Sequence, residues 1–184
     1  EGADGAGLGN GGCGVSEVVM TEEAAFASVQ SVVELGRARV HKVIVTIGGG
    51  CVVELGKTTD ALIPSSSPAL EHLEIVGNAR PLSAPPLPFI ALPTTSGTGA
   101  EVTKNAVISV PDQGRKVSLR DDRMFPILAI IDPALTDNTP RSVTLASGLD
   151  AITQVIEPYL SCRANQMTDA ICRQAIPLGL AALA

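Results

Sequence analysis

Short apolar runs alternate with helical patterns over most of the chain. The runs "KVIVTI" (42–47), "FIAL" (89–92) and "ILAIID" (127–132) have the length and apolar content of buried strands. A helical spacing of apolar residues precedes the first run over 21–38, and a second helical pattern follows it over 52–63. Strands and helices that alternate in this way form a parallel sheet with helices packed on it. We therefore predict an α/β fold.

One later segment has a different pattern. Residues 105–121, "NAVISVPDQGRKVSLRD", contain two alternating runs on either side of "PDQG". That tetrapeptide suits a type I turn with Gly114 in the left-handed conformation. The pattern predicts a β-hairpin.

The pattern changes again near residue 139. The strand signal disappears, Pro140 suits the start of a helix, and the remaining segments are helical in pattern, with Pro158 and Pro177 as kinks or stops. The predicted units are a glycine-rich disordered tail (1–18), an α/β domain (19–139) and the start of an all-helical domain (140–184).

Composition narrows the possible partners. The 184 residues carry a net charge of −6, and only 2% of them are aromatic. Because there is no basic cluster or aromatic platform, we expect no nucleic-acid partner. The apolar run 171–184 is too short and too interrupted to span a membrane. The widely scattered cysteines favour reduced thiols and a cytoplasmic location. A mitochondrial or other organellar location stays open, because the N-terminus looks incomplete.

The first predicted strand runs directly into "GGGC" (48–51), the glycine turn. Glycines after a buried strand let the backbone turn tightly and approach a ligand closely. The helix that follows presents free N–H groups and the positive end of its dipole, which suit a pyrophosphate. A tight turn without a ligand is the alternative.

A second polar loop, "PTTSGTGAE" (93–101), follows the second predicted strand. We call it the hydroxyl loop, because its threonines and serine can hydrogen-bond a polar ligand. The carboxyl ends of parallel strands meet at one edge of a sheet, where ligands bind in open α/β folds. Two such loops at one edge predict a binding site more strongly than either loop alone.

Other polar residues are less specific. Asp150, Gln154 and Glu157 share one face of a predicted helix and could supply oxygen ligands, or simply form a solvated face. The remaining candidates are all expected at the surface: Lys57, His41 and His72.

Together these segments resemble the iron-containing (group III) alcohol dehydrogenase family. The resemblance rests on "VIVTIGGGCVVELGK", "PFIALPTTSGTGAEVTKNAVI", "RKVSL", "AIIDPALT" and "GLDAITQVIEPY", in that order from about Val19 to the C-terminus. It implies a Rossmann-like dinucleotide-binding domain, incomplete at its N-terminal side, followed by the start of an all-helical domain. It also implies a central portion of a longer enzyme, because family members continue beyond both ends.

The resemblance assigns residues to the cofactor, NAD or NADP. Gly49, Gly50 and Cys51 would lie at the pyrophosphate, with Cys51 where the family commonly has serine. The further cofactor contacts that it implies are Thr94, Thr95, Thr98, Asn105 and Lys116.

The resemblance also implies a divalent metal, iron or zinc, between the two domains. Asp150 matches the first metal ligand, and Gln154 stands where the family usually has histidine. A glutamine oxygen is a much poorer ligand for these metals than imidazole. Two further metal-binding histidines of the family would lie after Ala184, and neither His41 nor His72 matches them.

The implied activity is hydride transfer between NAD(P) and a small alcohol, aldehyde or ketone, assisted by the metal. No catalytic residue is assigned, and a homo-oligomer stays open. One alternative is a metal-independent reductase of the same fold, like maleylacetate reductase, which Gln154 favours and Asp150 opposes. The other is a truncated, catalytically inactive fragment.

Overall fold

The computed structural model describes residues 14–20 and 23–184. Most of the predicted tail therefore lies outside the described residues, and 14–18 have no regular secondary structure. The helices are α1 (Phe26–Arg37), α2 (Gly50–Leu62), α3 (Ala69–His72), α4 (Arg141–Leu160) and α5 (Gln166–Leu183). The strands are β1 (Ile44–Gly48), β2 (Phe89–Pro93), β3 (Asn105–Val110), β4 (Arg115–Arg120) and β5 (Leu128–Ala129).

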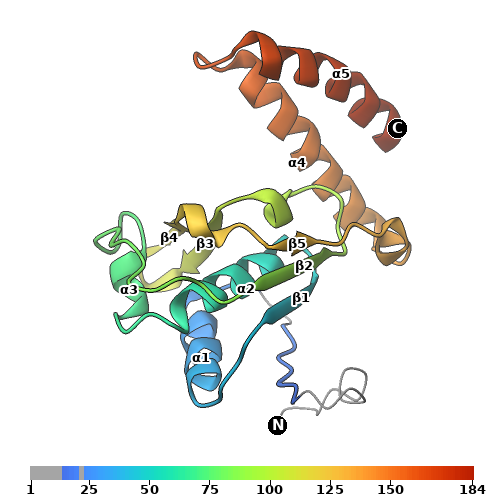
Figure 1. Ribbon diagram of the computed structural model, residues 1–184. Helices are drawn as coiled ribbons and strands as arrows, with labels where there is room; N and C mark the ends of the chain where they lie inside the picture. Colours follow the sequence, from blue (N-terminus) through green and yellow to red (C-terminus); the bar gives the residue numbers. More distant parts are fainter. Residues whose placement is uncertain (1–13, 21–22) are drawn as a thin grey trace.

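A parallel sheet of order β1-β2-β5 carries the glycine turn and the hydroxyl loop at one edge (Figure 1). Helix α2 packs on this sheet, and Gly56 is where they come closest. A Cβ at Gly56 would lie 2.2 Å from the Thr46 methyl and 2.7 Å from the Phe89 ring. Only glycine fits that spacing, so the helix lies unusually near the strands. This arrangement confirms the predicted α/β fold.

The third predicted strand is shorter and more exposed than expected. Strand β5 covers only Leu128–Ala129, and the flanking Ile127 and Ile131 are 68% and 62% exposed. Apolar strands of a parallel sheet are buried only when elements cover both faces. Helix α2 packs on β1 and β2, and within 14–20 and 23–184 no helix packs extensively on β5. The prediction of a buried strand over 127–132 was therefore wrong for most of its length.

The predicted hairpin is confirmed. Strands β3 and β4 pair antiparallel, and Gly114 has the expected left-handed backbone, with φ of 59°. Their inward residues pack with α1 in the main hydrophobic core. Its fully buried members include Val29, Val33, Ala106, Ile108 and Leu119.

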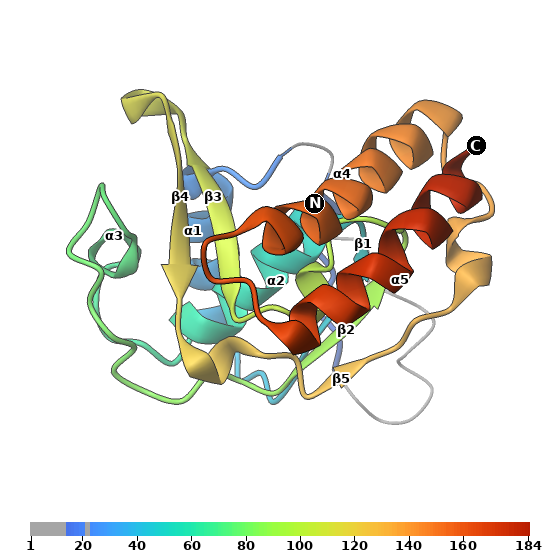
Figure 2. The ribbon, with the colours of Figure 1, turned by 90° about the horizontal axis from the view of Figure 1, so that it is seen from above.

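Helices α4 and α5 form an antiparallel pair that projects from the α/β part (Figures 1 and 2). Pro140 precedes α4 as predicted, and the Asn165 side chain caps α5 by accepting from the N–H groups of Met167 and Thr168. Both helices continue through their internal prolines, Pro158 and Pro177, so neither proline is a stop. The domain boundary at residue 139 stays a prediction.

Lys57 was wrongly expected at the surface. It is fully buried, and its Nζ donates to the Thr103 carbonyl at 2.7 Å, to Thr103 Oγ1 at 2.6 Å and to the Asn105 carbonyl at 2.9 Å. The three acceptors match the three donors of an ammonium group, so hydrogen bonds offset the free-energy cost of burying the charge. Helix α2 is thereby tied to the segment that leads from the hydroxyl loop into β3.

The surface prediction for the histidines also fails. His72 is 2% exposed, its Nδ1 lies 2.7 Å from the Arg80 carbonyl, and its Nε2 lies 3.1 Å from Ser65 Oγ. Because a carbonyl only accepts, Nδ1 donates, and in the neutral ring Nε2 accepts from the serine. His41 is half-buried against the Gly36 carbonyl. Both rings hold loops in place.

Asp60 should make stability depend on pH. Its side chain is 1% exposed, its Oδ1 has no hydrogen-bond partner, and burial raises the pKa of its carboxyl from 3.8 to about 8, against the opposing effect of Lys57. Between those values the folded chain keeps a proton that the unfolded chain has lost. The free energy of unfolding should therefore fall as pH rises from 5 to 7.5, a range in which Lys57 stays largely protonated in both states.

Asp60→Asn should flatten this slope in urea unfolding measured across that pH range. Asp112→Asn, which changes an exposed carboxyl in the hairpin turn, serves as the control and should keep the slope of the wild type. An unchanged slope in Asp60→Asn would contradict the prediction.

Candidate functional site

Helix α2 begins without a side-chain cap. Its N-cap residue, Gly49, has an extended backbone, and the Gly49 carbonyl accepts from the N–H groups of both Val52 and Val53. The N–H groups of Gly50 and Cys51, in the first turn, have no intrahelical acceptor. They lie at the positive end of the helix dipole, which makes this turn suitable for an anion.

The hydroxyl loop lies directly against the glycine turn, as predicted. The Thr94 N–H donates to the Gly48 carbonyl at 3.0 Å. A Cβ at Gly50 would lie 2.7 Å from the Thr98 methyl, and one at Gly49 would lie 3.2 Å from the Thr95 methyl. Glycines at these positions therefore allow the threonine side chains to reach the start of α2.

Helix α4 contacts the other side of the hydroxyl loop. A Cβ at Gly97 would lie only 2.2 Å from the Ser147 carbonyl oxygen, so the loop backbone touches the helix backbone. Just before α4, the Thr139 hydroxyl donates to the Thr94 carbonyl at 3.0 Å. The hydroxyl loop is thus held between α2 and α4.

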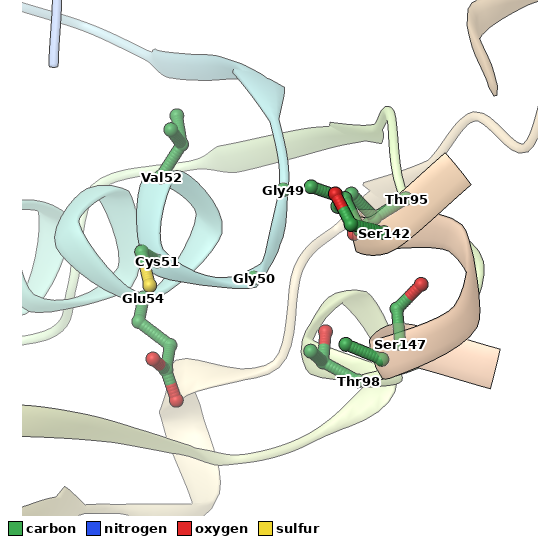
Figure 3. Close-up of a pocket in the computed structure, with 11 residues that line it drawn as sticks. Gly49, Gly50, Cys51, Val52, Glu54, Thr95, Thr98, Ser142 and Ser147 are labelled. Carbon is green, nitrogen blue, oxygen red and sulfur yellow. The ribbon is translucent and has the colours of Figure 1, made fainter. Parts of the chain in front are cut away.

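These three segments line an open cavity of about 530 Å³. Figure 3 shows Thr95 and Thr98 between the glycine turn and α4, with Ser142 and Ser147 on the helix side. The cavity is lined by Gly49, Gly50, Cys51, Val52, Glu54, Thr95, Thr98, Ser142, Val143, Ala146 and Ser147. Backbone N–H groups and hydroxyls together suit a phosphorylated or otherwise polar ligand.

An acid also borders the cavity. Glu54 points from α2 toward the hairpin, where its Oε1 accepts from the Val107 N–H at 3.2 Å (Figure 3). Burial raises the pKa of this carboxyl, while the Val107 hydrogen bond and the charges of Lys57 and Lys116 oppose the rise. Glu54 is thus held against the hairpin at the border of the cavity.

The structure brings together only some of the residues predicted for the cofactor. Gly49, Gly50, Cys51, Thr95 and Thr98 line the cavity.

The other three do not line it. The Thr94 backbone is used in the contacts with Gly48 and Thr139, and the Asn105 carbonyl binds Lys57. Lys116 is exposed on β4 and forms an ion pair with Glu23.

Sequence reasoning missed the contribution of α4. Ser142, Val143, Ala146 and Ser147 form one wall of the cavity. The segment "RSVTLASG" is rich in small residues, which permit close approach of a backbone, and this was the only signal in the sequence.

The two predicted metal ligands do not form a site that fits iron or zinc. Gln154 Nε2 donates to Asp150 Oδ2 at 2.7 Å, so the carboxylate is already engaged by the amide. Across the described ranges 14–20 and 23–184, no three His, Cys, Asp or Glu side chains gather in a group that could hold a metal ion. One carboxylate and one neutral amide oxygen are a poor donor set for either metal.

Comparison with known proteins places the chain in a family. The family model described as iron-containing alcohol dehydrogenase matches residues 9–133, which is more than half of the chain. The chain belongs to the iron-containing alcohol dehydrogenase family. The match begins within the segment predicted as a tail and confirms the resemblance seen in the motifs.

Curated relatives of this family member are much longer. It is 36% identical over 135 residues to the probable alcohol dehydrogenase EutG of Escherichia coli, a match that covers 73% of this chain and 33% of the relative. It is 44% identical over 86 residues to the 1-propanol dehydrogenase PduQ of Citrobacter freundii, covering 47% and 23%. The chain thus spans about a third or less of these relatives.

Solved structures show the same fold. An alcohol dehydrogenase from Oenococcus oeni matches with a TM-score of 0.79 and 31% identity, over 89% of this chain and 42% of that one. A sulfoacetaldehyde reductase from Bifidobacterium kashiwanohense, solved in complex with NAD+, matches with a TM-score of 0.79 and 28% identity, over 89% and 43%. These matches extend past residue 133 and so include part of the helical segment.

The described helices include no candidate membrane span. None of them combines the length and the apolar character that crossing a bilayer requires.

Gly97 should be essential to the contact between the hydroxyl loop and α4. In Gly97→Ala the new methyl would meet the Ser147 carbonyl, and backbone cannot yield as a side-chain tip can. We expect a loss of about 1–3 kcal/mol in the free energy of unfolding, measured with urea. Gly14→Ala is the control, because a methyl there meets nothing within 4 Å. Equal stability of the two variants would refute the contact.

Proposed function

We propose that the cavity between α2, the hydroxyl loop and α4 binds the pyrophosphate of NAD or NADP. The observation that carries this proposal is the meeting of an uncapped helix N-terminus and threonine hydroxyls in one cavity at the carboxyl edge of a parallel sheet. That edge is where open α/β sheets bind their ligands. The NAD+ complex of the reductase from B. kashiwanohense supports the same choice of ligand.

Individual residues would share the work of binding. The N–H groups of Gly50 and Cys51 would donate to phosphate oxygens, and Gly49 would leave room for them. Thr95 and Thr98 would offer hydroxyls from the opposite wall. Thr94, Asn105 and Lys116 would act from outside the cavity lining, and the Lys116 ammonium is close enough to interact with the charge of Glu54.

For the longer protein, we propose an alcohol dehydrogenase that acts on a small alcohol, aldehyde or ketone. The bound nicotinamide would supply or accept the hydride. The residues of this chain would hold the pyrophosphate and so fix the position of the cofactor. Because Asp150 and Gln154 do not fit iron or zinc, we derive no step through a metal.

The hydrogen bond between Gln154 and Asp150 favours a second candidate function. This candidate is a metal-independent reductase of the same fold, like maleylacetate reductase. A catalytically inactive fragment that at most binds nucleotide is the remaining alternative. A cytoplasmic location and a homo-oligomer are also proposals.

Cys51→Ser should strengthen NADH binding. Cys51 is exposed in the first turn of α2 and lines the cavity, and a hydroxyl is a better hydrogen-bond donor than a thiol. One added hydrogen bond corresponds to a gain of about two- to tenfold in affinity. Because the chain supplies only part of the site, we expect weak binding. An NMR titration can measure it through the changes in amide chemical shifts.

The shifts should concentrate on residues 49–52 and 95–98. Cys162→Ser is the matched control, since Cys162 is also exposed but lies between α4 and α5. Shifts elsewhere, or none at millimolar NADH, would overturn the assignment of the cavity to the dinucleotide.

A further inference from the structure

The polar face of α4 is turned toward the hydroxyl loop. Ser147 and Gln154 lie about two helical turns apart on one face, with Asp150 between them. The Ser147 carbonyl touches Gly97, and Gln154 Nε2 donates to the Thr98 carbonyl at 3.2 Å. Successive positions of the helix thus meet successive positions of the loop.

The Gln154 amide has both of its N–H donors in use. One serves Asp150 Oδ2 at 2.7 Å and the other serves the Thr98 carbonyl. A neutral imidazole has one N–H and could serve only one of these acceptors, while a glutamate has none. Glutamine therefore suits a bridge between helix and loop better than either alternative.

The loop is shaped to receive this bridge. Gly99 follows Thr98 with a positive φ of 62°, a conformation that glycine adopts without strain. A Cβ there would lie 3.7 Å from Gln154 Oε1, so the amide lies directly over the turn.

We propose that Gln154 is a positioning residue of the dinucleotide site, which holds the hydroxyl loop against α4 instead of binding a metal. Its amide keeps Thr95 and Thr98 in place in the cavity wall. The bridge is a property of the free chain. Only its consequence for cofactor affinity rests on the proposed function.

Hydrogen exchange in the ligand-free chain tests the bridge. Gln154→Ala removes it, and Gln154→Glu keeps the size but loses both donors and places a second acid beside Asp150. We expect the amides of residues 95–100 to exchange about two- to tenfold faster in both variants. This factor corresponds to the net free energy of one hydrogen bond. The midpoint of thermal unfolding should fall by no more than about 2–4 °C, the shift that the loss of one hydrogen bond corresponds to in a chain of this size.

Gln174→Ala is the matched control, because Gln174 is an exposed glutamine in the middle of α5. It should leave the exchange of residues 95–100 unchanged. Wild-type exchange rates in both Gln154 variants would overturn the proposal.

NADH titration separates the bridge from the proposed function. If the wild-type chain binds NADH, Gln154→Ala should bind it about two- to tenfold more weakly. Unchanged affinity would overturn the positioning role. If the wild type does not bind NADH, the proposed function fails, and the exchange experiment alone decides whether the bridge exists.

Zinc titration tests the rival role of the same pair. In calorimetry with Zn²⁺ alone, we expect no saturable binding that depends on Asp150. The wild type and Asp150→Asn should therefore give the same titration. A stoichiometric site that depends on Asp150 and slows exchange of residues 95–100 would overturn the proposal, because the metal would then take over the pair.

Discussion

The close approach of α2 to the sheet and to the hydroxyl loop is the constraint on which the rest of the structure depends. Gly56 lets the helix lie against Thr46 and Phe89, and Gly50 lets Thr98 reach its first turn. Lys57 then ties the helix to the segment after the loop through three hydrogen bonds. One rigid helix thus sets the distance to the sheet, to the hydroxyl loop and to the segment after the loop. The uncapped N–H groups and the threonine hydroxyls therefore meet in a single cavity.

Helix α2 buries two ionisable side chains, and the fold offsets the cost of only one of them. Lys57 is satisfied by oxygen acceptors from another segment, whereas Asp60 is buried with one oxygen unpartnered. The pKa of Lys57 is lowered to about 8 by burial, and that of Asp60 is raised to about 8 for the same reason. The same helix thus carries both an uncapped N-terminus and two buried ionisable groups with shifted pKa values.

Family membership and local chemistry point to different parts of an enzyme. The glycine turn and the hydroxyl loop keep the arrangement that an anion site needs, although Cys51 replaces a hydroxyl with a thiol. The Asp150–Gln154 pair, in contrast, is engaged in holding the loop. The chain spans about a third of the length of EutG, and cofactor binding is the part of the activity that we propose for its own residues.

The sequence by itself determined the elements and the family. Periodicity located β1, β2, the hairpin and α4, and the order of motifs led to the family, because local patterns and glycine positions are written directly in the chain.

Tertiary structure decided the rest. Lys57 proved buried because its acceptors come from residues 103–105, a segment distant in sequence. His72 proved buried because Ser65 and Arg80, on either side of it in the chain, fold around its ring. Strand β5 proved exposed because no described helix packs extensively on it. The wall that α4 contributes, and the bridge from Gln154 to Thr98, depend on contacts between residues about fifty positions apart, which no local pattern records.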